Sequence, residues 1–172
     1  TRQLEDAGVS AIVMYSLFEE QIIQESIKLH QDLIRGAESY SEAMTYIPEY
    51  GLYSIGPQTY LDQLAKIKAA VSVPVIGSLN GATSGGWVEY ARKIQDAGAD
   101  ALELNLYYLA TDPNVTSNEL EDMYVGLVKD VATQINIPLS VKLSPFITAL
   151  PNFARRLAEA GARGLVLFNR FY

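Results

Sequence analysis

The fold is decided by two segments that share one pattern: VPVIGSL at residues 73–79 and IPLSVKL at residues 137–143. In each segment a proline precedes a run of mostly apolar residues, which suits the first residue of a strand because no backbone donor is needed there. The two prolines, Pro74 and Pro138, are 64 residues apart. The repeat therefore predicts a unit of strand, helix, strand and helix about 64 residues long.

A second pattern leads into three apolar runs: DAGVSAIVM at 6–14, DAGADALEL at 96–104 and EAGARGLVL at 159–167. It is typical of a helix end, a glycine cap, a short turn and a strand. Strands that alternate with helices predict right-handed crossovers and a parallel sheet. The repeating unit favours a TIM (β/α)8 barrel over a doubly wound sheet, and no G-x-G-x-x-G segment follows any predicted strand.

We therefore predict an α/β fold with strands at 10–16, 73–80, 101–107, 138–144 and 164–170. Helices are expected at 18–36, 57–71, 85–97, 118–134 and 149–160, with Thr116 or Ser117 as the cap of the fourth. Five strands are too few to close a barrel, which typically takes about 250 residues. We expect residues 1–172 to form a single domain that covers about five βα units and is an internal, incomplete piece of a larger barrel.

Composition excludes several classes of function. The 172 residues include 13 Lys and Arg against 20 Asp and Glu, and the net charge of −7 predicts no nucleic-acid or anionic-membrane partner. The absence of cysteine excludes a thiolate zinc site and a cysteine nucleophile. The single histidine, His30, is expected on a solvated helix face. The sequence contains no run of about 18 apolar residues, so it predicts no membrane span.

Polar residues recur at the predicted carboxyl ends of the strands, where a barrel of this kind has its active site. Along residues 101–107 the leucines share one face, whereas Glu103, Asn105 and Tyr107 share the other. Four strands each deliver a polar residue to the same rim: Asn80, Asn105, Lys142 and Asn169. Three amides and one cation suit a planar heterocycle rich in carbonyl and imide groups.

Lys142 carries the sharpest signal, because an ammonium group inside a strand is costly to bury without a partner. One interpretation is that its side chain reaches solvent or pairs with Glu103. The functional alternatives are a cation that faces a ligand anion or an electron-rich atom, and an amine nucleophile.

The motifs at these positions resemble those of the dihydroorotate dehydrogenase family of FMN-dependent (β/α)8 barrels. ELNL at 103–106 matches the family's E-L-N-[LI] strand end, and VKLSP at 141–145 matches its V-K-[LI]-x-P strand. SLNG at 78–81 falls at an S-[IL]-x-G segment, Gly51-Leu52 at a loop G-[LF], and Phe168-Asn169 at a strand end that contacts ligand. The order and spacing hold over nearly the whole chain.

The resemblance implies FMN as cofactor and dihydroorotate, or a related dihydropyrimidine, as small-molecule substrate. It also implies a cytoplasmic enzyme of pyrimidine biosynthesis that is a homodimer at full length. Lys142 would contact the flavin near N1 and O2 and stabilise negative charge on the reduced ring. The cofactor-binding residues implied are Ser16, Asn80, Asn105, Lys142 and Phe168. The substrate-binding residues implied are Gly51, Leu52, Asn105 and Asn169.

The chain departs from the family pattern at the catalytic base, a Cys or Ser two to three residues after the asparagine. Tyr107-Tyr108 stands at this place. A tyrosine needs a lowered pKa to act as a base near neutral pH, and the alternative is that both tyrosines pack as a lid. The candidates for the catalytic base are Tyr107, Tyr108, Ser117 and Asp112.

Three functions remain open. The first is a flavin oxidoreductase in which a loop residue removes a proton from the substrate. The second is a barrel lyase or aldolase in which Lys142 forms a Schiff base. The third is a non-catalytic half-barrel subunit that assembles with itself or with a second chain through its open sheet edges.

Overall fold

The computed structural model describes residues 1–18, 57–80, 84–108 and 110–169, so most of the helix expected at 18–36, with His30, lies outside the described residues. One parallel sheet contains five strands in the order of the sequence. These are β1 (Ile12–Phe18), β2 (Val75–Asn80), β3 (Ala101–Leu106), β4 (Leu139–Leu143) and β5 (Gly164–Leu167). The helices are α1 (Arg2–Asp6), α3 (Pro57–Ala70), α4 (Ser84–Asp96), α5 (Ser117–Ala132) and α6 (Leu150–Glu159).

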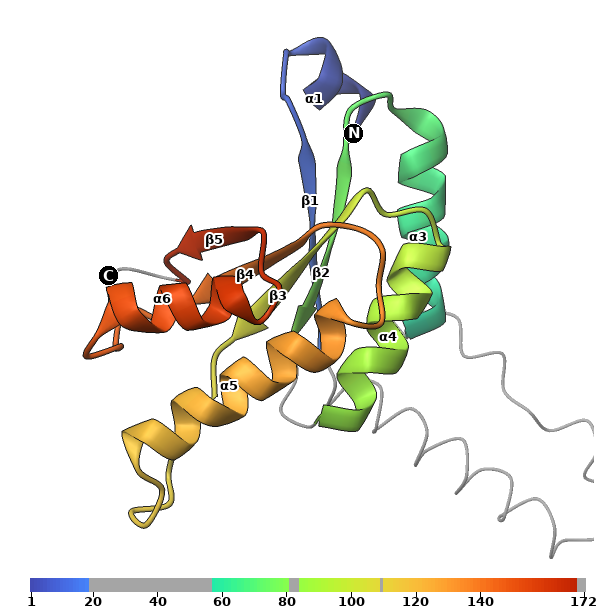
Figure 1. Cartoon of the computed structure of the whole chain (residues 1–172). Helices are drawn as coiled ribbons and strands as arrows, with labels where there is room; N and C mark the ends of the chain where they lie inside the picture. Colours follow the sequence, from blue (N-terminus) through green and yellow to red (C-terminus); the bar gives the residue numbers. More distant parts are fainter. Residues whose placement is uncertain (19–56, 81–83, 109, 170–172) are drawn as a thin grey trace, which may run out of the picture.

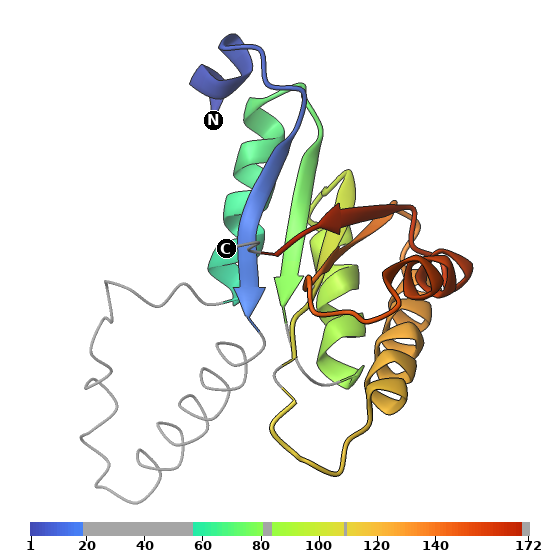
Figure 2. The same ribbon diagram turned by 90° about the vertical axis from the view of Figure 1, so that its left-hand side faces the viewer.

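The sheet twists strongly from β1 to β5, and α3 to α6 cover one of its faces (Figures 1 and 2). A doubly wound sheet reverses its strand order and carries helices on both faces. Here each strand pairs with the next one in the sequence. This single direction of winding is that of a (β/α)8 barrel wall, and the predicted fold class is confirmed.

The helices pack on the sheet through the apolar face predicted from the alternation in β3. Leu102, Leu104 and Leu106 are almost fully buried. Strand and helix approach each other closely at Gly77 in β2, where an added Cβ would lie 2.3 Å from the side chain of Ile94 in α4. A glycine is therefore needed there for the strand to approach the helix.

The amino ends of three strands share the predicted glycine-capped turn. Gly8, Gly98 and Gly161 have φ values of 90°, 98° and 117°, a region that glycine enters without steric cost. After the second of these turns the Asp100 carboxylate accepts hydrogen bonds from Lys68 Nζ and from the backbone N–H of Val75, each at 2.7 Å. These contacts fasten α3 and the turn to β2.

The boundaries differ from the prediction by a few residues. β1 covers residues 12–18 instead of 10–16, and its register with β2 shifts between Val13 and Ser16. β5 ends at Leu167, yet the N–H of Asn169 still donates to the carbonyl oxygen of Leu143 at 2.7 Å. Thr116 is the cap of α5, because its hydroxyl accepts from the N–H of Glu119 in a capping box.

Candidate active site

A pocket of about 350 Å³ opens at the carboxyl ends of the strands. Five residues predicted to bind cofactor or substrate, or both, line it together with the predicted catalytic candidate Tyr107 and with Phe18. The full lining is Ser16, Phe18, Asn80, Asn105, Tyr107, Lys142 and Asn169. The strand register explains the convergence, because Asn80 pairs with Asn105 and Asn105 pairs with Lys142 across neighbouring strands.

Ser78 is the centre of the hydrogen-bond network beneath this pocket. The residue is 1% exposed, and its hydroxyl lies 3.2 Å from Glu103 Oε1 and 2.9 Å from the hydroxyl of Ser16. Asn105 Nδ2 donates to Ser78 Oγ at 3.1 Å and to Ser16 Oγ at 2.8 Å. A hydroxyl has one hydrogen to donate, so Ser78 donates to the Glu103 carboxylate and Ser16 donates to Ser78.

Counting donors and acceptors in the same way shows which atom of Asn105 can bind a ligand. Its two N–H groups are both used, one by Ser16 and one by Ser78. Its side-chain carbonyl oxygen, an acceptor, is the group left for the pocket. Because Asn105 is 4% exposed and its amide is held at two points, this acceptor is well fixed in position.

Lys142 and Glu103 form the charged pair at the base of the pocket. The Nζ–Oε1 distance is 2.5 Å, and the side chains are 24% and 6% exposed. The interpretation that Lys142 pairs with Glu103 is therefore confirmed, while Lys142 also lines the pocket. Glu103 compensates the charge that would otherwise be costly to bury. A lysine held in such a pair differs from the free amine that a Schiff base requires.

Tyr60 on α3 closes the network from the helix side. Its hydroxyl accepts the N–H of Ser78 at 2.8 Å and donates to the carbonyl oxygen of Ser78 at 3.2 Å. Burial raises the pKa of Tyr60 to about 12, so it remains a neutral hydrogen-bonding group. The ring of Tyr15 packs edge-on against it at 5.1 Å, and the Tyr15 hydroxyl donates to Gln63. Tyr15 is therefore directed toward α3.

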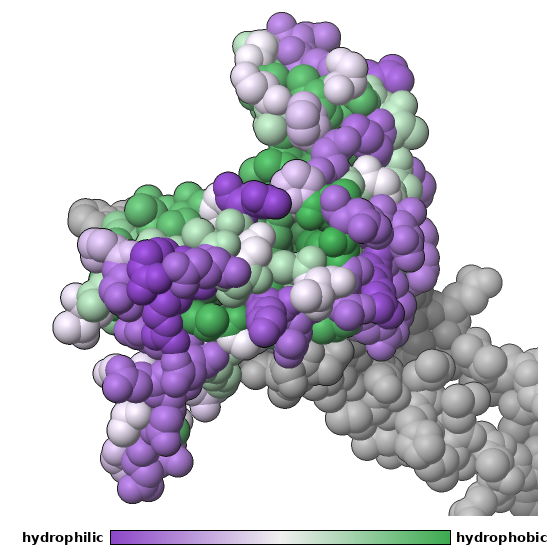
Figure 3. All heavy atoms as spheres, viewed as in Figure 1, coloured by the Kyte–Doolittle hydropathy of each residue, from purple (hydrophilic) through white to green (hydrophobic). Residues whose placement is uncertain are grey.

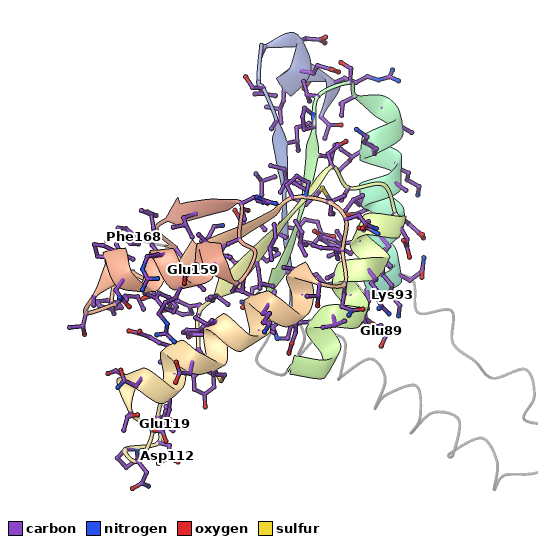
Figure 4. All side chains as sticks on the ribbon, viewed as in Figure 1. Glu89, Lys93, Asp112, Glu119, Glu159 and Phe168 are labelled. Atoms are coloured by element: carbon purple, nitrogen blue, oxygen red, sulfur yellow. The ribbon has the colours of Figure 1, made fainter. Side chains whose placement is uncertain are left out.

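Four other predicted site residues lie elsewhere. Ser117 is the exposed first residue of α5, and Asp112 belongs to the preceding turn, where it accepts from Asn114. Figure 4 shows Asp112 and Glu119 together at that tip, away from Phe168.

Phe168 is partly buried against the core and does not line the polar pocket. Tyr108 lines a neighbouring pocket. Gly51 and Leu52 lie outside the described residues.

Sequence reasoning missed Phe18, which lines the polar pocket at the end of β1. The expected strand stopped at residue 16, whereas β1 runs to Phe18 and pairs this residue with Asn80. Side chains alternate between the two faces of a strand, so Ser16 and Phe18 share the face opposite Leu17. Leu17 is fully buried among core residues, and this alternation in the sequence could have indicated Phe18 as a pocket residue.

Within the described parts of the chain no three His, Cys, Asp or Glu side chains gather as a metal site would require. The described helices also include none with the length and apolar character needed to cross a bilayer.

A singly wound βα sheet with its polar pocket at the carboxyl ends of the strands defines a protein of the (β/α)8 barrel class. The family model described as dihydroorotate dehydrogenase matches residues 35–171. The chain therefore belongs to the dihydroorotate dehydrogenase family, and its predicted resemblance is confirmed.

Relatives agree with this assignment. The chain is 34% identical over 128 residues to the protein named dihydroorotate dehydrogenase B (NAD(+)), catalytic subunit, of Geobacillus sp., covering 69% of this chain and 39% of the relative. It is 33% identical over 145 residues to the protein of the same name from Halalkalibacterium halodurans, covering 78% and 44%. Both names are those of oxidoreductases, and the chain spans about two fifths of their length.

Solved structures share the fold at low sequence identity. A dihydrodipicolinate synthase matches with a TM-score of 0.53 and 20% identity, covering 92% of this chain and 43% of its own. The dihydrodipicolinate synthase of Agrobacterium tumefaciens also has a TM-score of 0.53, with 16% identity, covering 95% and 44%. At these identities the likeness shows the architecture alone.

Proposed function

We propose that the polar pocket is part of the active site of an FMN-dependent dehydrogenase that oxidises dihydroorotate, or a related dihydropyrimidine, in pyrimidine biosynthesis. The observation that carries the proposal is the convergence of Lys142, Asn80, Asn105 and Asn169 on one pocket, in a chain of this family. A small-molecule substrate is consistent with this pocket and with the relatives' description as catalytic subunits.

The donors and acceptors of the pocket fit the ring of FMN. An isoalloxazine ring has an electron-rich N1–O2 edge and an imide N–H, so it needs a cation or donor beside an acceptor. Lys142 supplies the cation, and Asn105 supplies a fixed carbonyl acceptor. Lys142, Asn105, Asn80 and Ser16 would hold this group, which supplies hydride acceptance when bound.

The remaining residues of the pocket would hold the substrate and move its proton. Asn169 carries an amide that can bind a pyrimidine edge, and it lines the same pocket as Lys142. Tyr107 is the candidate for the base, since it lines the pocket whereas Tyr108 and Ser117 do not. Tyr107 is half-exposed, so a proton that it takes can pass to water.

The effect of the Lys142 charge on flavin binding is the part of this proposal that can be tested most directly. A cation facing the ring stabilises negative charge and strengthens binding of the reduced ring more than of the oxidised one. Glu103 contacts the ammonium group at 2.5 Å and holds it in place. Removal of Lys142 should therefore weaken flavin binding without removing the rest of the pocket.

The test is a titration of lumiflavin, the ring without its ribityl phosphate, followed by quenching of its fluorescence. We expect the chain to bind it and Lys142→Met to weaken binding about tenfold, while the matched control Lys129→Met, on the exposed side of α5, leaves it unchanged. Equal binding by the chain and Lys142→Met, or no binding at all, would contradict the proposal. Trapping of a carbonyl compound on Lys142 by borohydride would favour a lyase instead.

A further inference from the structure

A second pocket, of about 210 Å³, lies at the same end of the strands as the polar one. It is formed between the helix-facing side of β3 and β4 and the helices α5 and α6. Its floor consists of Leu106, Leu143 and Phe153, which are 2%, 1% and 0% exposed. Tyr107 lines both pockets, so one side chain is shared between the polar and the apolar site.

The lining of the second pocket is rich in aromatic rings. Five of its ten residues are aromatic: Tyr107, Tyr108, Tyr124, Phe146 and Phe153. None of the described residues that line it carries a charge. Burial raises the pKa of Tyr124, whose neutral hydroxyl accepts the backbone N–H of Tyr108 at 2.9 Å. The ring centroids of Tyr124 and Phe153 are 6.3 Å apart. These two side chains therefore already form an inner wall without a ligand.

The outer part of this pocket exposes aromatic surface to water. Phe146 is 86% exposed and Tyr107 52% exposed, although both lie beside a fully buried floor. Exposed aromatic groups around an apolar hollow are a common feature of small-molecule sites. An apolar cavity of about 150 Å³ binds one benzene molecule, so the volume here suits a single ring or a compact branched alkyl group.

We infer that this second pocket binds an aryl or similarly compact apolar substituent of the molecule whose polar head lies in the first pocket. The inference rests on the proposed function for the polar head, while the apolar pocket itself stands on its own lining. The ligand is thus amphipathic: a planar head with hydrogen-bonding edges meets Asn169 beside the ring that Lys142 and Asn105 would hold, and an apolar group passes Tyr107.

The first experiment tests the apolar pocket with 4-fluorotoluene, whose binding to the chain is followed by fluorine NMR. Leu120→Trp fills the pocket and should abolish binding, whereas Met123→Trp, on an exposed position of the same helix, should leave it unchanged. Phe146→Ala should weaken binding about threefold, and at 86% exposure this change leaves the core intact. No binding, or equal binding by Leu120→Trp, would overturn the inference.

The second experiment tests whether one ligand uses both pockets. Uracils bearing a 4-fluorobenzyl group at N1, C5 or C6 are compared with uracil and with 4-fluorotoluene in the presence of lumiflavin. At least one isomer should bind about tenfold more tightly than either part, and both Lys142→Met and Leu120→Trp should remove this gain. Binding of 4-fluorotoluene with no gain for any isomer would overturn the shared ligand. Failure of lumiflavin alone to bind would count against the proposed function instead.

Discussion

The two ends of the strands use polar residues in opposite ways. At the amino ends the Asp100 carboxylate accepts hydrogen bonds from Lys68 and from the N–H of Val75, and these contacts serve the fold. At the carboxyl ends Lys142 and Asn105 are held by the protein but still line an open pocket. In (β/α)8 barrels the first end is associated with stability and the second with chemistry. Substitutions at the amino ends should therefore change mainly the free energy of unfolding, whereas substitutions at the carboxyl ends should also change ligand binding.

One lysine–carboxylate pair at each end of the strands shows this difference directly. Lys68 and Asp100 are 33% and 36% exposed, whereas Lys142 and Glu103 are 24% and 6% exposed. The first pair is screened by solvent and ties a turn to a helix. The second pair balances a buried carboxylate against a cation and contributes to the charge of the site.

The hydropathy of the surface adds a third region to the comparison. Hydrophilic side chains gather over the outer sides of α3, α4 and α5, while hydrophobic ones appear around β5 (Figure 3). Leu165 and Leu167 of this strand are 37% and 53% exposed. The helix layer that buries the corresponding leucines of β3 does not cover β5 among the described residues.

The largest effect is expected from Gly161→Ala at the amino end of β5. The residue has a φ of 117°, and an added Cβ would lie 2.6 Å from Cβ of Ala132. The backbone cost and the steric overlap together should lower the free energy of unfolding by about 3 kcal/mol, measured by urea denaturation. Lumiflavin binding at the opposite end should persist in the folded fraction.

The matched control is Gly8→Ala, at the same place in the repeated turn. Its φ is 90°, but nothing lies within 4 Å of an added Cβ. The backbone cost alone should lower the free energy of unfolding by about 1 kcal/mol. Equal losses for Gly8→Ala and Gly161→Ala would show that contact with Ala132 contributes nothing.

A smaller effect is expected at the carboxyl ends from Glu103→Gln. This change removes the negative charge that pairs with Lys142, a mostly buried side chain. It preserves an oxygen that accepts the hydrogen bond from Ser78. We expect the free energy of unfolding to fall by about 2 kcal/mol, less than for a fully buried pair because Lys142 reaches solvent. Urea denaturation measures this loss.

The double variant Glu103→Gln/Lys142→Met sharpens the interpretation. Each single change leaves an unbalanced charge, so the double variant should be more stable than the sum of the two losses predicts, by about 1 kcal/mol or more. Lumiflavin binding should nevertheless stay weak, since Lys142 is absent. Additive losses would mean that the 2.5 Å pair contributes no coupling.

Much of this comparison could be predicted from the sequence. The glycine-capped turns and the strand–helix repeat depend on local backbone chemistry, and the predicted caps Gly98 and Gly161 have the positive φ typical of such turns. The alternation in β3 placed Glu103 and Asn105 on the face opposite the leucines, where their hydrogen bonds now lie.

The details that depend on contacts distant in the sequence could not be predicted. Tyr60 reaches Ser78 from a helix, and nothing near Tyr60 in the sequence indicates that its hydroxyl will close the network. β1 extends to Phe18, where it pairs with Asn80 of β2, because cross-strand pairing and not local preference sets its end. The apolar pocket likewise needs two helices and two strands to form.

The smallest effect is expected from Asp100→Asn, at the amino end of β3. Burial alone would raise the pKa of this carboxyl, but hydrogen bonds from Lys68 and Val75, with the charge of Lys68, lower it below its ordinary value of 3.8. An asparagine keeps one acceptor and loses the charge. Since the pair is about one third exposed and screened, the loss at pH 7 should be about 1 kcal/mol or less.

The pH dependence of this last change tests the cause. A lowered pKa in the folded state means that the contribution of Asp100 is fully present above 3.8 and is lost as the pH falls through the folded value. Urea denaturation of the chain and of Asp100→Asn should therefore differ most above pH 5 and converge toward pH 2. A constant difference would assign the effect to the hydrogen-bonding geometry of the side chain rather than to its charge. In that case Asp100, unlike Glu103 in its pair with Lys142, would stabilise the fold through hydrogen bonds and not through its charge.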